Sequence, residues 1–584
     1  MLDHRRAALD RARQLVVCAA VPLTALVYSF QLTSFLHAKE CALWICLLPL
    51  AALTPMRGPG DSSGVREYSP LLVLLLYSLL ASVLSFFTPL DVGHVRRDVV
   101  VEISRIAALL LFAVFSFDLF RSADARQRIQ RAVEATAGIA SALALAQRAG
   151  WLSFLFPPFN EEVARPYSVF GNASLLGGYL AVAFPLLLHR SLTRPRYNPL
   201  DTAGLSLISA ALLISGARSA WLAALVGSLV VLCRKGVYIR RAMLFSFIAP
   251  LIAVAVVFAD PSSTLDRFLL TFSRSDSGLG LRCWFLTGTI HMIRHQGLIG
   301  VGAGNYPYWS PRYLGDALWA AGGPQLEHNT LHTEHAHCDP LELLAEYGVM
   351  AAVMWGWFLV RLLQVRGPEW GGLAAFGVFS LFNAPLHSAP HALVAVVLAS
   401  SLSGRERDPS LSAGPRRSRY QRIFHLAAVL VFFSGFVLFS LVPSYLLRKA
   451  ETLHIRGTAS VAAYHRAAAW PGAPRIAYEK YGIALLEAGE FGLSQQVFTR
   501  ALEGLDTGAV YLGLGAAAFK NGDRAAAREA LLACVHRWPS KFDAWYLLMR
   551  CVDAGERSGL MEKARPWLTT DEADQLLTLA QERG

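Results

Sequence analysis

The sequence is poor in charged residues for its length. Asp, Glu, Lys and Arg make up only 16% of its 584 residues, whereas 54% are hydrophobic and the mean hydropathy is +0.40. Soluble domains usually contain about 25% charged residues. The low charge therefore argues against a row of soluble domains and indicates a membrane protein, in which long apolar segments recur along the chain.

Motifs of several other protein classes are also lacking. The formal net charge is +12, but most Lys and Arg lie in short segments between apolar runs, without a nucleic-acid-binding module. The stretch "GLIGVGAGNY" (297–306) lacks the Lys and Ser/Thr of a P-loop, so its glycines predict tight turns where backbone approaches backbone. The eight cysteines follow no framework spacing. We therefore expect neither a nucleic-acid partner nor a cofactor.

Apolar segments long enough to cross a bilayer, roughly 17–25 residues, recur about thirteen times. Their centres lie near residues 25, 48, 80, 110, 140, 181, 207, 226, 250, 351, 379, 396 and 433. The first, residues 15–36, follows the basic start "HRRAALDRARQ", and its length favours an uncleaved helix over a signal peptide. We predict an all-α, polytopic bundle of about 12–13 transmembrane helices over residues 1–446.

Basic residues collect in alternate segments between these spans. Seven such segments hold 25 Lys and Arg, whereas the short segments between them hold few, such as Arg96, Arg97 and Arg165. Positive residues favour the cytoplasmic side, so the N-terminus is predicted to be cytoplasmic. The periplasmic face then carries a long loop of about residues 260–340 and, after an odd number of spans, the C-terminal part.

Residues 447–584 show paired amphipathic helices instead of spans. The turns "EAGE" (487–490) and "KNGD" (520–523) lie 33 residues apart. Two Trp-Pro pairs, at 470 and 538, lie 68 apart, twice the 34-residue period of the tetratricopeptide repeat. We predict a periplasmic, tetratricopeptide-like α-solenoid of two to four degenerate repeats; an irregular helical bundle is the alternative.

Three stretches contain polar residues that lipid alone would not tolerate. "ISGARSAWLAALVG" places Arg218 where one span ends and the next begins. There it is either a snorkelling interfacial arginine or a guanidinium that holds phosphate oxygens at a cavity mouth. Arg282 lies in the predicted long loop, where arginines are usually solvated. The third stretch is "EHAHCDPLELLAEYG" (334–348).

This third stretch belongs to a histidine cluster with three interpretations. The candidate ligands are His328, His332, His335, His337, Cys338 and Asp339. A metal site fits poorly, because the spacing is not H-E-x-x-H and residues 335 and 337 point apart on a helix. Helix capping by Asp339, Pro340 and Glu342 would explain the acidic residues but not the histidines. In the third interpretation one histidine accepts a proton from a hydroxyl, and two arginines hold a diphosphate without a metal.

Together these stretches resemble the O-antigen ligase and O-antigen polymerase superfamily over about residues 165–360. "VFGNASLLGGYLAVAFPLLL" is similar to its Gly-Asn-rich helix start and "SGARSAWLAALVG" to its Ser-Arg helix start. "RCWFLTGTIHMIRHQGLIGVGAGNY" is similar to its Arg-bearing loop. "HAHCDPLELLAEYGVMAAV" is similar to a block in which His is normally followed by Asn.

The resemblance implies a glycosyltransferase of the bacterial inner membrane, in lipopolysaccharide or exopolysaccharide biosynthesis. It would transfer a glycan from an undecaprenyl-diphosphate donor with inversion and without a metal. Arg218 and Arg282 would bind the diphosphate, and His337 would be the catalytic base. Cys338 stands where the family has Asn, which puts the positioning role of that neighbour in doubt. Supporting residues near the base would be Glu334, His335 and Cys338.

The acceptor stays open. Lipid A core would make the protein a ligase, a second lipid-linked glycan a polymerase, and a Ser or Thr side chain a protein O-oligosaccharyltransferase. The solenoid would bind a protein partner or the acceptor. A lipid-linked glycan transporter would need ionisable residues inside several spans, and only Glu102 with Arg105, predicted to pair, lies well inside one. A membrane-anchored repeat scaffold would not explain why Arg218, Arg282 and His337 are all predicted on the periplasmic side of the membrane.

Overall fold

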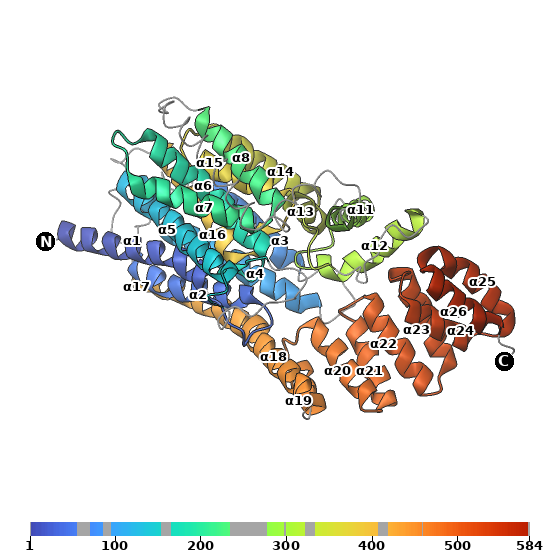
Figure 1. Cartoon of the computed structure of the whole chain (residues 1–584). Helices are drawn as coiled ribbons and strands as arrows, with labels where there is room; N and C mark the ends of the chain where they lie inside the picture. The colour runs from blue at the N-terminus through green and yellow to red at the C-terminus, as the bar shows by residue number, and fades with distance from the viewer. Residues whose placement is uncertain are drawn as a thin grey trace.

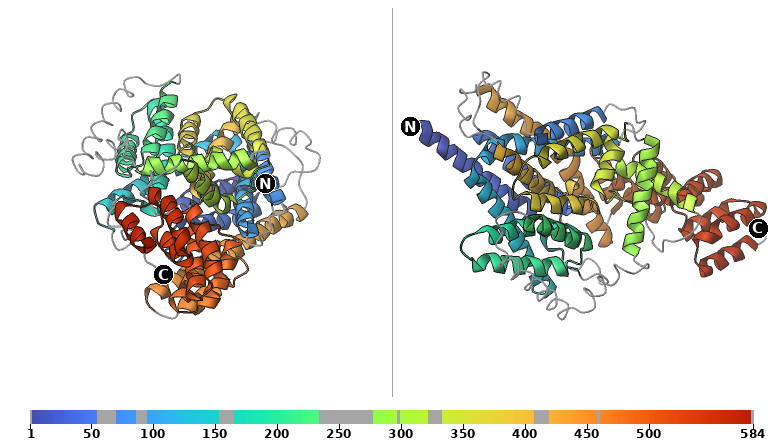
Figure 2. Two further views of the ribbon diagram at one scale, coloured as in Figure 1. Left: turned by 90° about the vertical axis from the view of Figure 1, so that its right-hand side faces the viewer. Right: turned by 90° about the horizontal axis from the view of Figure 1, so that it is seen from above.

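The computed structural model describes residues 2–54, 70–85, 95–152, 165–233, 277–296, 299–321, 333–406, 419–457 and 460–581. All regular secondary structure within these ranges is helical, and a helical bundle continues into a solenoid (Figure 1). The two ends of the chain lie at opposite ends of the molecule (Figures 1 and 2).

The bundle is built from two groups of helices. The first group is α1 (Leu2–Leu26), α2 (Phe35–Leu53), α3 (Pro70–Ser85), α4 (Val95–Ser116), η1 (Phe117–Arg121), α5 (Ala123–Arg148), η2 (Ser168–Phe170), α6 (Ala173–Thr193), α7 (Pro199–Ile214) and α8 (Arg218–Leu232). The second group is α11 (Ser277–Gln296), α12 (Tyr306–Ala321), α13 (Asp339–Tyr347), α14 (Val349–Leu363), α15 (Trp370–Ser380), η4 (Pro385–His387), α16 (Ala389–Ser403), η5 (Gly404–Glu406), α17 (Arg419–Phe436), η7 (Val437–Leu441) and α18 (Val442–Ile455).

Four helices in the described ranges are long and apolar enough to cross a membrane. They are Phe35–Leu53, Arg97–Arg121, Ala173–Thr193 and Ile423–Ile455. Six shorter apolar helices accompany them: α3, α7, α8, α14, α15 and α16. The predicted spans fall on these helices or on α1 and α5, except the one near residue 250, which lies outside the described residues. The prediction of an all-α, multi-pass membrane bundle is confirmed.

The bounds predicted for the first span are wrong. A continuous apolar run suggested one helix over residues 15–36, but α1 begins at Leu2 and ends at Leu26. Lys39 of α2 explains the break, because its Nζ donates to the carbonyl oxygens of Ala25 at 2.5 Å and Val27 at 3.0 Å. Ser34 then caps α2 by accepting from the Leu36 amide. A buried lysine amine that donates to one carbonyl in the last turn of α1 and to another just beyond it thus ends that helix early.

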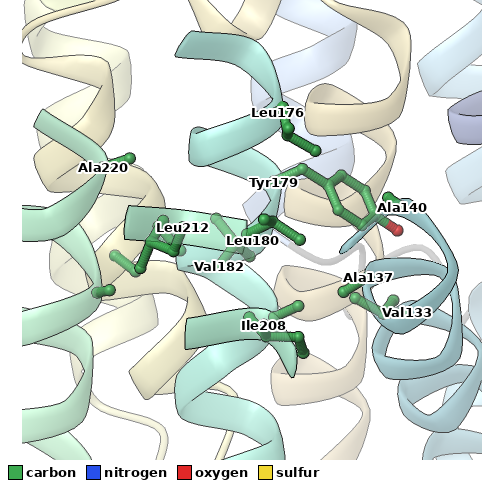
Figure 3. Packing of buried hydrophobic residues seen from close by; sticks show 14 of the residues in the cluster. Val133, Ala137, Ala140, Leu176, Tyr179, Leu180, Val182, Ile208, Leu212 and Ala220 are labelled. Carbon is green, nitrogen blue, oxygen red and sulfur yellow. The ribbon is translucent and has the colours of Figure 1, made fainter. Parts of the chain in front are cut away.

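The hydrophobic core of one half of the bundle is centred on α6, which is buried on nearly all sides (Figure 3). The "FGNASLLGG" stretch explains how α6 begins. Gly171 takes a left-handed φ of 73°, and Asn172 caps the helix by accepting from the Ser174 amide at 2.7 Å. A Cβ at Gly178 would collide with the Phe379 ring of α15. The small residues therefore let α15 approach α6 closely.

The C-terminal helices form the predicted solenoid. They are α19 (Ser460–Ala468), α20 (Arg475–Glu487), α21 (Phe491–Leu502), α22 (Gly508–Lys520), α23 (Arg524–Arg537), α24 (Phe542–Cys551), α25 (Ala554–Ala564), η8 (Arg565–Trp567) and α26 (Thr570–Gln581). The first helices of three successive pairs begin at 475, 508 and 542, so the repeat is 33 and then 34 residues. Gly489 and Gly522 make left-handed turns within the first two pairs, as the motifs predicted.

The solenoid is attached to the bundle at more than one place. The helix from Ile423 to Ile455 runs without interruption from the bundle toward it, so the predicted domain boundary at 446/447 falls inside α18. Arg475 of α20 forms an ion pair with Asp98 of α4. On α12, the Trp319 indole donates to the His536 carbonyl of α23 at 3.0 Å. α12 therefore lies between α11 and the solenoid (Figure 1).

Candidate functional site

His337 is held in an unusual backbone conformation before α13. Its φ of +53° is left-handed, a conformation that only one other non-glycine residue in the described ranges adopts. Such a φ costs a non-glycine residue roughly 1–3 kcal/mol, and residues strained in this way cluster at functional sites. The imidazole stacks on Phe285 of α11, with ring centroids 5.6 Å apart and 17° between the planes. Backbone strain and stacking together fix the direction of this side chain.

Glu342 is the centre of a buried hydrogen-bond cluster at the start of α13. Its side chain is only 2% exposed. Oε2 accepts from the Ala336 amide at 2.8 Å, and Oε1 accepts from His335 Nδ1 at 2.8 Å and from His387 Nε2 at 3.0 Å. The rings of His335 and His387 lie 4.1 Å apart. Glu342 thus ties the histidine loop to η4, which precedes α16.

The predicted cap of α13 is only partly correct. The helix does start at Asp339, but Cys338 occupies the N-cap position and makes no side-chain cap hydrogen bond. Asp339 instead accepts from the Leu386 amide at 3.1 Å, and Glu342 reaches back to Ala336 rather than capping. The neighbouring η4 turn offers Asp339 a better partner than its own helix does.

Arg105 extends the cluster into the bundle. Its Nη1 donates to His387 Nδ1 at 2.7 Å, and it forms an ion pair with Glu102 one turn away on α4. The predicted pairing of Glu102 with Arg105 is confirmed. Sequence reasoning missed His387, although it lies in "PLHSAP", a proline-flanked turn between two apolar helices. A lone histidine in such a turn was the only available signal.

The geometry of three side chains in this cluster would also suit a metal ion. In the described part of the chain, His335, Glu342 and His387 offer ligand atoms within 4.8 Å of one another. However, Arg105 is always protonated, so His387 Nδ1 must accept from it. The neutral ring then carries its proton on Nε2, which faces Glu342 and has no lone pair for a metal. These contacts favour a hydrogen-bonded chain over metal ligation.

The two neighbouring histidines differ in their affinity for protons. Burial, and then the positive charges of Arg282 and His335, lower the pKa of His337 to about 4. Burial also opposes the charge of His335, but the carboxylate of Glu342 outweighs it and raises the pKa of His335 to about 9. At neutral pH His337 is therefore a neutral base and His335 a cation.

The two arginines predicted to bind the diphosphate differ from each other in their relation to His337. Arg282 lies one turn before Phe285 on α11, and its charge acts on His337. Arg218 is the first residue of α8, after the left-handed Gly216. The next residue, Ser219, accepts from Asn383 Nδ2 at 2.8 Å, and Asn383 lies four residues before His387. Arg282 is thus brought to His337, whereas the helix of Arg218 is tied to the turn that carries His387.

The remaining candidates occupy the same loop or lie outside the described residues. Glu334 is exposed, and its charge favours the protonated form of His335. Cys338 is buried. His328 and His332 lie outside the described residues.

The glycine-rich loop packs against the far end of α13, and its glycines let backbone approach backbone, as predicted. The amides of Val301 and Gly302 donate to the carbonyl oxygens of Ala345 and Glu346 at 2.8 and 2.9 Å. Gly300 has a φ of +80°, and a Cβ there would collide with the Glu346 carbonyl. Only glycine allows this approach, so the loop that leads from α11 to α12 is fixed to α13.

Residues 203–356 match the family model described as O-antigen ligase (Wzy_C). No curated protein matches the chain. Among solved structures, the crystal structure of the APC/C hetero-tetramer Cut9–Hcn1 aligns with 94% of this chain and 90% of its own chain, at 12% identity and a TM-score of 0.21, too low to indicate a common fold. The matched range contains Arg218, Arg282, His337 and Glu342, but neither Arg105 nor His387. The protein therefore carries, at residues 203–356, a domain of the O-antigen ligase family, the ligase- and polymerase-type glycosyltransferases that its motifs resemble.

Proposed function

We propose that the protein transfers a glycan from an undecaprenyl-diphosphate-linked donor to an acceptor hydroxyl, in the manner of an O-antigen ligase. The observation that carries this proposal is the arrangement of His337, a neutral imidazole fixed by Phe285 beside the cationic Arg282. A base next to a phosphate-binding cation is what attack on a diphosphate-activated sugar requires.

His337 takes the proton of the acceptor hydroxyl. The hydroxyl oxygen attacks the anomeric carbon on the face opposite the diphosphate, so the configuration inverts as the bond to the phosphate oxygen breaks. The departing diphosphate gains negative charge, which Arg282 and Arg218 neutralise without a metal or cofactor. The negative charge of the bound diphosphate also raises the pKa of the neighbouring His337, so donor binding makes this imidazole a stronger base.

The membrane placement is part of the proposal. Residues 1–446 form the transmembrane domain of the bacterial inner membrane, with the N-terminus in the cytoplasm and the loop of about residues 260–340 in the periplasm. Residues 447–584 form a periplasmic repeat domain that binds a protein partner or the acceptor. The attachment of α23 to α12 supports this placement, because α12 also contacts the histidine loop, where the Ser310 hydroxyl donates to the Thr333 carbonyl at 3.1 Å, so one helix joins the solenoid to that loop.

Three acceptors are compatible with this chemistry, because each offers a hydroxyl: lipid A core, a second lipid-linked glycan, or a Ser or Thr of a protein. Exopolysaccharide or O-antigen polymerase and protein O-oligosaccharyltransferase are therefore the alternatives within the family. Transport of a lipid-linked glycan is less favoured, because Arg105 is bound to both Glu102 and His387, so this charged pair is engaged within the protein. A repeat scaffold would give no reason for the strained backbone of His337.

Reconstitution into liposomes with a lipid-linked oligosaccharide and each acceptor tests the proposal. We expect His337→Ala to lower the transfer rate about 100-fold or more, the usual contribution of a general base. Arg282→Ala and Arg218→Ala should raise KM for the donor and lower kcat. Arg361→Ala, which changes an exposed arginine at the end of α14, is the matched control and should stay active. Unchanged transfer in His337→Ala would refute the assignment.

A further inference from the structure

We propose that His335 is a second working histidine of this site, which donates a hydrogen bond from its Nε2 to the leaving diphosphate and adds a positive charge there. The proposal rests on the proposed function and names a further catalytic residue for the same reaction. It divides the work between two histidines: His337 accepts the proton of the acceptor, and His335 stabilises the departing group.

The charge of His335 follows first from the balance of charges around Glu342. This carboxylate is almost fully buried and receives three hydrogen bonds, which keeps it ionised. A buried anion needs a cation close by. Arg105 is already paired with Glu102, and His387 is neutral because its Nδ1 accepts from Arg105. The cation that balances Glu342 is therefore His335.

The second observation is the direction of the ring. Nδ1 of His335 is bound to Glu342, on the buried side, yet 30% of the side chain is exposed. Among the described residues no hydrogen bond to Nε2 is found, and Nε2 is not one of the buried nitrogens that lack a partner, so this atom is accessible to solvent. The exposed part of this ring is thus a charged N–H donor that points away from the buried cluster. Such a donor, held rigidly by a buried carboxylate, suits the developing charge on a phosphate oxygen.

The third observation is the contrast with His337, two residues along the loop. The Glu342 carboxylate raises the pKa of His335 to about 9, whereas burial and Arg282 lower that of His337 to about 4. Neighbouring groups whose environments separate their pKa values in this way hold different protonation states at one pH and can take different roles in one reaction, here a proton acceptor and a charged hydrogen-bond donor. Among the described residues, the titratable and charged groups that face His335 are Asp339 and Glu342 on α13, Glu334 and His337 in the loop, His387 in η4, and Arg105 with Glu102 on α4.

The step balances without further reactants. The acceptor oxygen forms a bond to the anomeric carbon, and the bond from that carbon to the diphosphate oxygen breaks. The electron pair of the broken bond goes to the diphosphate, and the proton of the acceptor goes to His337. His335 keeps its own proton and lends only a hydrogen bond and its charge.

The test compares three variants of the full chain in liposomes with the same donor and acceptor. His335→Gln keeps a polar side chain but loses the charge, and we expect kcat to fall about 10- to 100-fold with little change in KM for the acceptor. His335→Arg, which restores a cation, should recover part of the loss. In Glu342→Gln the pKa of His335 should return toward about 6.5. Because the protonated form is active, activity should then be lost as pH rises through 6–7 instead of near 9.

His337→Ala separates the failure of this inference from that of the proposed function. If His335→Gln shows the kcat and pH profile of the wild type while His337→Ala is inactive, His335 has no role in the reaction and the proposed function stands. If the Arg variant recovers nothing and Glu342→Gln keeps the wild-type alkaline limit, His335 only supports the structure and the inference fails. Transfer at the wild-type rate in His337→Ala would overturn the proposed function itself.

Discussion

Replacing Gly300 with Ala tests whether the glycine-rich loop must touch α13 for the enzyme to work. Ala at φ +80° is strained by about 1–2 kcal/mol whatever surrounds it. Its Cβ would also meet the Glu346 carbonyl and lie 2.7 Å from the Gly348 amide nitrogen, so the loop must move away. Moving it breaks the hydrogen bonds of Val301 and Gly302 to α13, at about 1 kcal/mol each. We expect a total cost of about 3–4 kcal/mol.

The chain supplies a matched control at Gly489. Its φ is +81°, but a Cβ there meets nothing within 4 Å, so Gly489→Ala should cost only the strain of about 1–2 kcal/mol. Thermal unfolding in detergent measures the difference between the two variants, and transfer in liposomes measures its consequence. Gly300→Ala should lose most of its activity, because the loop joins α11, with Arg282, to α12. Equal stability and equal activity of the two variants would refute the argument.

Three further predictions concern protons, metal and the solenoid. For the wild type, kcat/KM for the donor, which reports the free enzyme, should stay constant from about pH 5 to 8. It should fall as pH drops through about 4, because His337 must be unprotonated to act as a base, and as pH rises through about 9, where His335 loses its charge. A pH–rate profile checks this, and an acid limb near pH 6.5 would contradict it. Chelator should leave the transfer rate unchanged, because Nε2 of His387 carries a proton, and a loss restored by one divalent metal would contradict this reasoning. Trp319→Ala should weaken docking of the solenoid by about 1–2 kcal/mol and lower the transfer rate, because it removes a hydrogen bond to His536 and an aromatic contact with Trp567. Limited proteolysis measures the docking, and Trp151→Ala, at a residue that is 78% exposed, is the control.

Local patterns were sufficient for the architecture. A membrane helix is a long apolar run and a repeat is a fixed spacing, so both can be seen within a few tens of residues. The left-handed turns at Gly489 and Gly522 and the close approach at Gly300 were predicted because only glycine allows them. The end of α1 was not predictable in this way, because it depends on Lys39, which belongs to the next helix.

The composition of the site was harder to predict because its residues are far apart in the chain. Arg105 and His387 are separated by 282 positions, and each looks ordinary in its own segment. From sequence, His335 was predicted to support His337 only because it lies two residues away. The structure shows a contact that sets its properties, the hydrogen bond between His335 and Glu342. The capping role assigned to Asp339 failed for the same reason, since the Leu386 amide that it accepts from lies 47 residues away.

The charged pair inside α4 bears on how much of the chain the site needs. From sequence, Glu102 and Arg105 were the only ionisable residues well inside a span, and they were predicted to pair rather than to line a transport pathway. Ionisable groups inside a span are nevertheless costly unless they have a function. The structure gives them another function: Arg105 fixes the tautomer of His387, and His387 helps to hold Glu342 against the histidine loop. Neither Arg105 nor His387 lies in the range that matches the O-antigen ligase family. A chain limited to residues 203–356 would therefore keep His337 with the two arginines and Glu342 with His335, but it would lose His387, which donates to Glu342, and Arg105, which fixes the tautomer of His387.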